Sequence, residues 1–178
     1  LILCFTNPLS INLSEGDSVN KYFLMHPTSI LFVCLGNICR SPMAEGVFRQ
    51  ILKQNGILNE LEIDSAGLIA YHQGELPDSR MRYFAEKRGY HLDHHSRPFT
   101  RLDFERFDMI IGMDDKNIDG LKAHAMTKEE EKQIFRMTDF CRNVQADHVP
   151  DPYYGDDQGF EHVIDILEDA CRGLFDDI

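Results

Sequence analysis

The sequence predicts an α/β fold, a three-layer sandwich in which a central parallel four-stranded sheet has helices on both faces. Two observations carry this prediction. Residues 30–33 and 107–111 form mostly apolar runs rather than a strict polar–apolar alternation, which is typical of strands buried on both faces. Segments with apolar residues at helical spacing lie between such runs, and strands that alternate with helices form parallel sheets through right-handed crossovers.

The predicted elements follow one another along the chain. The predicted strands cover residues 29–34, 61–65, 107–111 and 134–140. The predicted helices cover residues 42–55, 78–88, 115–125 and 159–175, with glycines after the first two and a continuous apolar face on the last. The remaining segments are an irregular stretch at 68–76, a polar crossing element at 90–101 and a solvated charge run at 128–132.

Length and composition limit the classes of protein to consider. A chain of 178 residues with 43% hydrophobic content is typical of one soluble globular domain. The net charge of −12 argues against a nucleic-acid partner, which requires a basic face. No apolar run approaches the ~20 residues of a membrane span. The five cysteines are few and odd in number, which favours a reducing compartment, so we expect a cytoplasmic protein.

The first 28 residues differ from the rest of the chain. They contain Asn, Ser and Gly without a sustained hydrophobic period, and Met25 falls just before the first predicted strand. We therefore expect residues 1–28 to be a poorly ordered N-terminal extension and residues 29–178 to form the domain. The alternative is an ordered edge strand at residues 1–5.

The loop after the first predicted strand carries chemically useful side chains. Cys34 ends the strand, Arg40 and Ser41 follow after a short loop, and Pro42 suits the first position of a helix. Backbone N–H groups between a strand and a helix N-terminus bind anions. The same positive field favours the thiolate form of Cys34, and a guanidinium can hold two phosphate oxygens at once.

An alternative interpretation treats Cys34 as a small core residue at the end of a buried strand. Gly36 and Asn37 favour the functional interpretation, because both tolerate left-handed backbone angles that let a loop curl around a ligand. A thiolate that attacks a phosphate ester also needs a proton donor for the leaving group. The best candidate is Asp151, which lies between two prolines that stiffen its loop. From this segment alone, a structural turn aspartate explains Asp151 equally well.

Four ordered motifs resemble those of the low-molecular-weight protein tyrosine phosphatase family. They are VCLGNICRSP at 33–42, DSAG at 64–67, MDDKN at 113–117 and DPYYG at 151–155. The resemblance covers roughly residues 30–175. It implies hydrolysis of phosphotyrosine in protein substrates through a phosphocysteine on Cys34, with Arg40 binding the phosphate and Asp151 acting first as acid and then as base. It implies no metal and no other cofactor, and we expect a monomer or weak self-association.

The resemblance also implies roles for the residues around these three. The phosphate-binding loop would include Leu35, Gly36, Asn37, Ile38, Cys39 and Ser41, and a supporting hydrogen-bond network would add Ser65 and His94. Cys39 would protect the nucleophile by forming a reversible disulfide with it under oxidants. Leu35, Ile38, Tyr71 and Tyr153 would line the slot for the substrate ring. Many bacterial relatives have tryptophan where Tyr71 stands, so the shape of this wall stays open.

Other functions must be weighed against this one. An arsenate reductase of the same fold would need further redox cysteines at short spacing, and Cys141 and Cys171 lie far apart. Protein-arginine phosphatases resemble this loop but carry threonine where Ile38 stands. A catalytically silent phosphotyrosine-binding module would not need the nucleophile, the arginine and the acid together.

A metal site is a weaker alternative. His91, His94 and His95 lie close together in sequence. They have no matching pattern of cysteines or carboxylates, so we expect no metal there.

Overall fold

The computed structural model describes residues 27–178. The expectations for residues 1–26, including the edge strand, lie outside the described residues. Thr28, which the sequence assigned to the extension, contacts the domain. Its backbone N–H and its hydroxyl both donate to Asp108 Oδ2, at 2.7 and 2.9 Å.

The core of the fold is the predicted four-stranded parallel sheet, and the structure gives its strand order as β2-β1-β3-β4. Its strands are β1 Ser29–Cys34, β2 Glu62–Gly67, β3 Met109–Gly112 and β4 Ile134–Arg136. All six residues of β1 and all four residues of β3 are buried. Because these two strands lie in the middle of the sheet, their apolar runs need no polar face.

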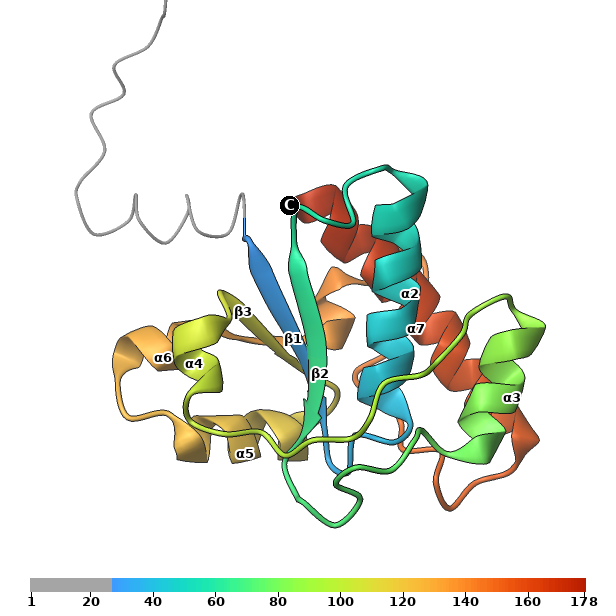
Figure 1. Ribbon diagram of the computed structural model, residues 1–178, viewed down its shortest axis with the longest axis horizontal. Coiled ribbons are helices and arrows are strands. Elements are labelled where there is room, and N and C mark those ends of the chain that lie inside the picture. The colour runs from blue at the N-terminus through green and yellow to red at the C-terminus, as the bar shows by residue number, and fades with distance from the viewer. Residues whose placement is uncertain (1–26) are drawn as a thin grey trace, which may run out of the picture.

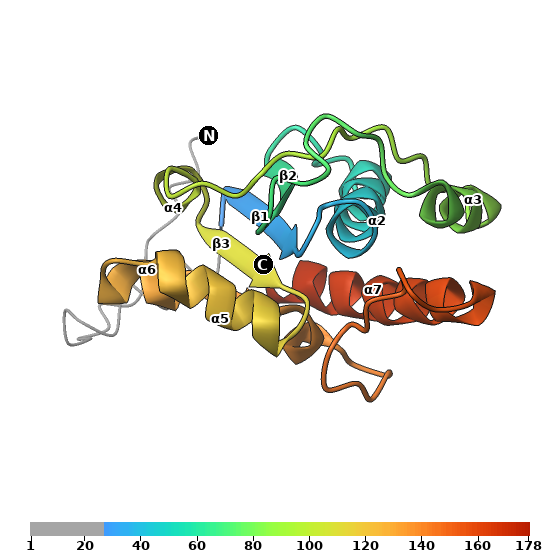
Figure 2. The same ribbon diagram turned by 90° about the horizontal axis from the view of Figure 1, so that it is seen from below.

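Helices cover both faces of the sheet, which confirms the predicted three layers (Figures 1 and 2). One face packs against α2 Arg40–Gln54 and α7 Asp157–Asp177, with α3 Ser79–Lys87 packed against α7. The other face packs against α4 Asp103–Arg106 and α5 Asp115–His124. Successive residues of β1 divide between the two cores: Ile30 and Phe32 belong to the first, whereas Leu31 and Val33 belong to the second.

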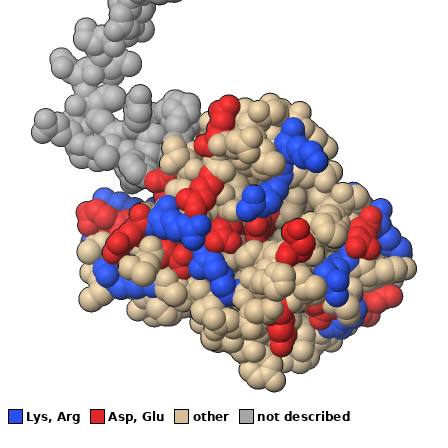
Figure 3. Space-filling model, in the orientation of Figure 1, with Lys and Arg blue, Asp and Glu red and all other residues tan. Residues whose placement is uncertain are grey.

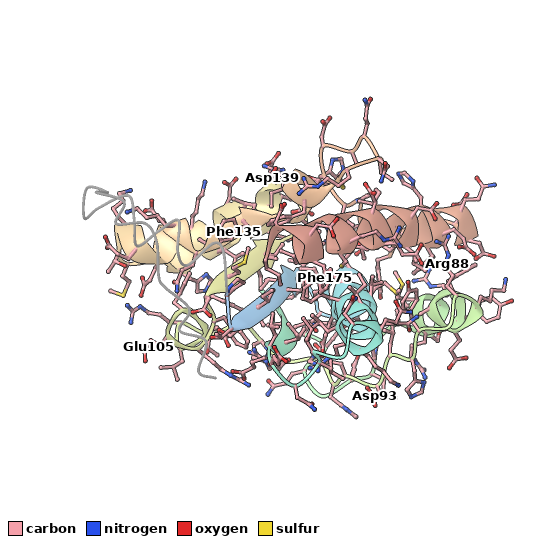
Figure 4. All side chains as sticks on the ribbon, turned by 90° about the horizontal axis from the view of Figure 1, so that it is seen from above. Arg88, Asp93, Glu105, Phe135, Asp139 and Phe175 are labelled. Carbon is pink, nitrogen blue, oxygen red and sulfur yellow. The ribbon has the colours of Figure 1, made fainter. Side chains whose placement is uncertain are left out.

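Helix α7 contributes many buried residues to the first core. Phe135 of β4 and Phe175 of α7 are partly buried and pack against this core (Figure 4). Arg88, which directly follows α3, forms ion pairs with Glu161 and Asp165 of α7 and so links the two helices. Among the described helices, none combines the length and the apolar content needed to cross a membrane.

The structure refines two predicted elements. Residues 128–132, predicted as a solvated charge run, form the exposed helix α6 Lys128–Lys132, and this helix was not predicted. Thr127 and Glu130 form a capping box at its start, a signal that is present in the sequence. The predicted strand 134–140 ends at Arg136 and continues as the 3₁₀ helix η1 Met137–Phe140. The turn brings Met137 and Phe140 into the core beside α7.

Smaller differences concern the element ends and the crossing segment. Helix α2 begins at Arg40 rather than Pro42, because Met43 N–H already donates to Cys39 O and closes a first turn. The short helix α4 was not predicted. Within residues 90–101 the crossing segment makes one isolated bridge, from Pro98 to Gly67 of β2.

The loop after η1 is held by a buried carboxylate. Asp169 of α7 is 8% exposed, and its Oδ2 accepts backbone hydrogen bonds from Arg142, Asn143 and Val144, each 2.9 Å long. Burial works to raise the pKa of Asp169, but these N–H donors outweigh it and lower the pKa to about 2.

We therefore predict that Asp169→Asn lowers the free energy of unfolding by about 1–3 kcal/mol at neutral pH, because it removes a charge-assisted acceptor from three donors. The folded pKa lies below the unfolded value, so this stabilisation is present above pH ~4 and is lost as the pH falls towards 2. The difference in the free energy of unfolding between Asp169→Asn and wild type should shrink over that pH range. Urea unfolding at several pH values measures it.

Asp176→Asn is the matched control, because Asp176 is an exposed residue of the same helix. Equal stability of Asp169→Asn and Asp176→Asn at neutral pH would contradict the prediction.

Candidate active site

The loop between β1 and α2 curls around the sulfur of Cys34 at the carboxyl edge of the sheet. Asn37 is the only non-glycine residue among residues 27–178 with a positive φ, 55°. This conformation turns its backbone N–H towards Cys34 Sγ, 3.3 Å away. The Ser41 hydroxyl donates to the same sulfur at 3.1 Å. Two donors on one buried sulfur stabilise its negatively charged form.

Gly36 has a different role from the one that the sequence suggested. It is not in the left-handed region. A Cβ atom on Gly36 would lie 3.1 Å from His72 Cδ2, so the glycine makes room for this ring. Gly67 at the end of β2 supports the loop from below. A Cβ atom there would lie 2.9–3.0 Å from backbone atoms of Leu35, Gly36 and Asn37.

The side chain of Asn37 holds the loop in place, as the predicted network requires. Its Nδ2 donates to the hydroxyls of Ser41 and Ser65, each at 2.9 Å. Its Oδ1 accepts from Arg97 N–H at 3.0 Å and lies 3.0 Å from His94 Nε2. The structure therefore brings together all four residues of the network implied by the resemblance.

His94 lies between acceptors on both sides. Its Nε2 faces Asn37 Oδ1, and its Nδ1 lies 3.3 Å from Glu45 Oε2 and 3.7 Å from Asp64 Oδ1. Both ring nitrogens therefore face side-chain oxygen atoms. Glu45 Oε2 also accepts from the Ser65 hydroxyl at 2.7 Å. These carboxylates were not among the predicted network residues.

The same groups are the only candidate metal ligands in the described part of the chain. One donor atom each from Glu45, Asp64 and His94 lies within 4.8 Å of the others. Both carboxylates already have cationic partners, Arg49 for Glu45 and Arg97 for Asp64. The charges of the cluster are thus compensated by the protein. The structure does not add His91 or His95 to it.

Arg40 is 2% exposed and lies between two carboxylates. Its Nη1 pairs with Asp114 and donates to Val149 O at 3.2 Å, while its Nη2 lies 2.9 Å from Asp151 Oδ2. Burial works to lower the pKa of Arg40, but the negative charges of Cys34, Asp151 and Asp114 raise it on balance. The guanidinium is therefore a fixed positive charge beside the Cys34 sulfur.

Asp151 reaches the site from a loop far away in sequence. Val149 N–H donates to Met113 O at 2.8 Å and ties the loop to the end of β3. Tyr153 N–H donates to Asp151 Oδ1 at 3.1 Å and orients the carboxylate. The side chain of Asp151 is 38% exposed, so it faces the open side of the pocket.

A pocket opens above Cys34 and Arg40. All four predicted wall residues line it: Leu35, Ile38, Tyr71 and Tyr153. The sequence did not predict His72, Ile69 and Tyr154, which line it too. Tyr71 is 81% exposed and its ring packs edge-on against His72, with centroids 4.8 Å apart. The walls are apolar and aromatic, whereas the base carries the thiol and the guanidinium.

Cys39 lines the same pocket and stands at the N-cap position of helix α2, where its side chain makes no capping hydrogen bond. Burial first, and then the nearby Asp78 carboxylate, raise the pKa of the Cys39 thiol. The raised pKa keeps Cys39 as a thiol, whereas a cysteine nucleophile reacts as a thiolate.

Asp114 is the residue whose role the sequence did not reveal. It caps helix α5, where its Oδ1 accepts from Asn117 N–H at 2.8 Å, and its Oδ2 pairs with Arg40. The sequence did offer one sign that Asp114 lies at the site: it follows just after β3, and the carboxyl ends of parallel strands meet at one edge of the sheet.

Comparison with known proteins places the chain among relatives of the same architecture. It is 43% identical over 145 residues to a putative low molecular weight protein-tyrosine-phosphatase of Synechocystis, covering 82% of this chain and 92% of that protein. It is 36% identical over 148 residues to the low molecular weight phosphotyrosine protein phosphatase of Rattus norvegicus, covering 83% and 94%. A crystal structure of a protein tyrosine phosphatase from Entamoeba histolytica superposes with a TM-score of 0.81 at 46% identity, over 83% of this chain and 94% of that one.

A family model matches most of the chain as well. Residues 29–178 match the model described as low molecular weight phosphotyrosine protein phosphatase. The match spans every strand of the sheet and both loops that carry Cys34 and Asp151. The chain therefore belongs to the low molecular weight phosphotyrosine protein phosphatase family.

Proposed function

We propose that this protein hydrolyses phosphotyrosine in protein substrates, with Cys34 as nucleophile, Arg40 as phosphate ligand and Asp151 as general acid and base. One observation carries the proposal. The sulfur and the guanidinium come from one strand–loop–helix unit, the carboxylate comes from a loop 111 residues beyond Arg40, and all three line one pocket. A purely structural role for any one of them would not require the other two.

The first step transfers the phosphoryl group to sulfur. The phosphate enters the loop, where backbone N–H groups and Arg40 stabilise the charge on its non-bridging oxygens. The Cys34 thiolate attacks phosphorus and forms an S–P bond while the P–O bond to the phenol breaks. The proton for the departing phenolate oxygen comes from Asp151 in its protonated form.

The second step hydrolyses the phosphocysteine. Asp151, now a carboxylate, takes a proton from a water molecule that attacks phosphorus, and the S–P bond breaks. The Ser41 hydroxyl, 3.1 Å from Cys34 Sγ, stabilises the thiolate as it leaves. Arg40 and the loop N–H groups supply the positive charge for both steps, so the mechanism requires no metal cofactor.

The shape of the pocket supports phosphotyrosine as the substrate. Aromatic and apolar side chains form its walls, and Asp151 faces the place where a phenolic oxygen would leave. Ile38 is 8% exposed and presents an apolar surface at the position where protein-arginine phosphatases would carry threonine. A planar phenyl ring fits these walls better than a guanidinium.

We extend the proposal to the cellular setting. A monomer or weak self-association, a cytoplasmic location and a substrate that is not a nucleic acid agree with the small, odd number of cysteines and the net charge of −12. On the face shown in Figure 3, Lys and Arg side chains are interspersed with Asp and Glu instead of forming one basic surface. Reversible Cys34–Cys39 oxidation is part of the proposal.

Substitution of the proposed catalytic groups tests this mechanism. We predict that Cys34→Ser abolishes the release of phosphate from a phosphotyrosyl peptide, and that Asp151→Ala slows it ~10²–10⁴-fold because general acid–base help is lost. Phosphate release under steady-state conditions measures both. Cys141→Ser, outside the pocket, is the control and should keep wild-type activity. Turnover by Cys34→Ser at the wild-type rate would rule out the proposed nucleophile.

A panel of substrates separates the competing functions. Phosphotyrosyl, phosphoseryl and phosphoarginyl peptides of the same flanking sequence should be hydrolysed with a clear preference for phosphotyrosine, because the others lack a phenyl ring for the pocket walls. Arsenate reduction coupled to a thiol donor should be absent. A preference for phosphoarginine would show that the protein is a protein-arginine phosphatase instead. Tight phosphotyrosine binding without turnover would indicate a binding module.

The close contact beneath the loop provides a further prediction. Gly67→Ala should lower kcat/KM for a phosphotyrosyl peptide by about 10–100-fold, because the added methyl group pushes backbone atoms of the phosphate-binding loop out of position. Gly159→Ala is the control, since its Cβ would meet only ordinary contacts at 3.9 Å or more. Unchanged kinetics in Gly67→Ala would show that the loop tolerates displacement.

A further inference from the structure

The loop that carries Asp151 has a second anchor, Arg80 of helix α3, on the side away from Arg40. Arg80 Nη2 donates to Tyr153 O at 3.1 Å, two residues after the proposed acid. Its guanidinium also lies over the Tyr153 ring, 5.6 Å from the centroid, and over the Phe160 ring of α7, at 4.8 Å. Arg80 thus holds the backbone and the side chain of Tyr153 together.

The opposite end of this connection reaches the phosphate-binding loop. Arg80 pairs with Asp78 as a fork, through Nε to Oδ1 at 3.1 Å and Nη2 to Oδ2 at 2.9 Å. Asp78 N–H donates to Ile38 O at 2.8 Å. A continuous path of hydrogen bonds therefore runs from Ile38, through Asp78 and Arg80, to Tyr153. We call these four residues the strut.

The strut matters because phosphate and Asp151 compete for the same nitrogen of Arg40. In the structure Nη1 of Arg40 contacts Asp114 and Val149 O, and Nη2 contacts Asp151. Among the contacts of the described residues, Nε and the second N–H of Nη2 are left for phosphate, so a phosphate that binds there through two oxygens competes with Asp151 for Nη2. When the Nη2 contact is lost, Asp151 keeps the Tyr153 N–H as its hydrogen-bond donor. The Asp151 carboxyl group is then positioned by its hydrogen bond with Tyr153 N–H.

We propose that Arg80 is a positioning residue for the general acid: it fixes Tyr153, and thereby Asp151, at a set distance from the nucleophile loop once Arg40 binds the phosphate. The inference rests on the proposed function, since it assumes that Asp151 protonates a leaving group. Arg80 itself does not touch the reacting atoms. Its side chain is 42% exposed, so its ion pair contributes little to overall stability and its removal leaves the fold intact.

The consequence is an effect that depends on the leaving group. A poorly placed acid costs most when the departing oxygen is strongly basic, as in phosphotyrosine, and least when the leaving group is itself acidic, as in p-nitrophenyl phosphate. Arg80→Met should lower kcat/KM for a phosphotyrosyl peptide about tenfold and that for p-nitrophenyl phosphate much less. Arg80→Lys, which keeps the charge and one donor, should recover part of the loss.

The experiment compares these variants in two backgrounds. The wild type is measured first; if it does not hydrolyse phosphotyrosine, the proposed function fails, and the positioning role with it. If it does, Arg80→Met is measured alone and combined with Asp151→Ala. A residue that acts through Asp151 has no further effect once Asp151 is gone, so the double variant should match Asp151→Ala.

Two further variants complete the test. Lys87→Met removes a positive charge from the same helix, where Nζ lies over the Tyr83 and Phe84 rings, and should behave as wild type. Asp78→Asn leaves Arg80 in place, keeps a capping side chain and weakens the strut, so it should show a smaller loss with the same leaving-group preference. Thermal unfolding confirms that all variants are folded.

Three results would overturn the proposal. One is an Arg80→Met variant with wild-type kinetics. Another is an equal loss for both substrates, which would make Arg80 a substrate-binding residue. The third is a loss that persists in the Asp151→Ala background. If Arg80→Met does not fold, Arg80→Lys and Asp78→Asn decide by the same criteria.

Discussion

The buried positive charge of Arg40 is the constraint on which the rest of the site depends. A charged group that is 2% exposed must be paired, because an unpaired buried charge costs several kcal/mol. The pairing brings Asp114 from the end of β3 and Asp151 from a loop after β4 to the first turn of α2. One side chain thus joins three segments that are remote in sequence, and it leaves a cationic floor beneath an open pocket.

The opposite side of the phosphate-binding loop is held by neutral hydrogen bonds. Asn37 adopts a left-handed conformation and uses every polar atom of its side chain, towards Ser41, Ser65, Arg97 and His94. A fully satisfied polar network of this kind rigidifies a site. The Cys34 sulfur is therefore preorganised by Asn37 and Ser41, whereas Asp151 is carried by a more exposed loop. The Asp78–Arg80 pair connects the two loops through Ile38 O and Tyr153 O.

Much of the fold could be predicted because its signals are local. The β1 run is apolar because both of its faces are buried, and the α7 face repeats at helical spacing. The errors occurred where a weak local pattern met a strong tertiary contact. Residues 137–140 look like a strand, but packing of Met137 and Phe140 beside α7 turns them into a 3₁₀ helix. Residues 128–132 are solvated, as their charges predicted, but the capping box that starts a helix there was not recognised.

For the site, the sequence alone identified the candidate nucleophile loop, since Cys34, Arg40 and Ser41 lie within one strand–loop–helix unit whose chemistry is local. It also identified Asp151 as the candidate acid, through the prolines around it, but not its partners. The pairing of Asp151 and Asp114 with Arg40, and the hydrogen bonds of Glu45 and Arg80, became visible only in the tertiary structure. The physical reason is that a charge pair or a hydrogen bond between distant segments leaves no periodicity in the sequence; it exists only once a parallel sheet has brought the carboxyl ends of its strands to one edge.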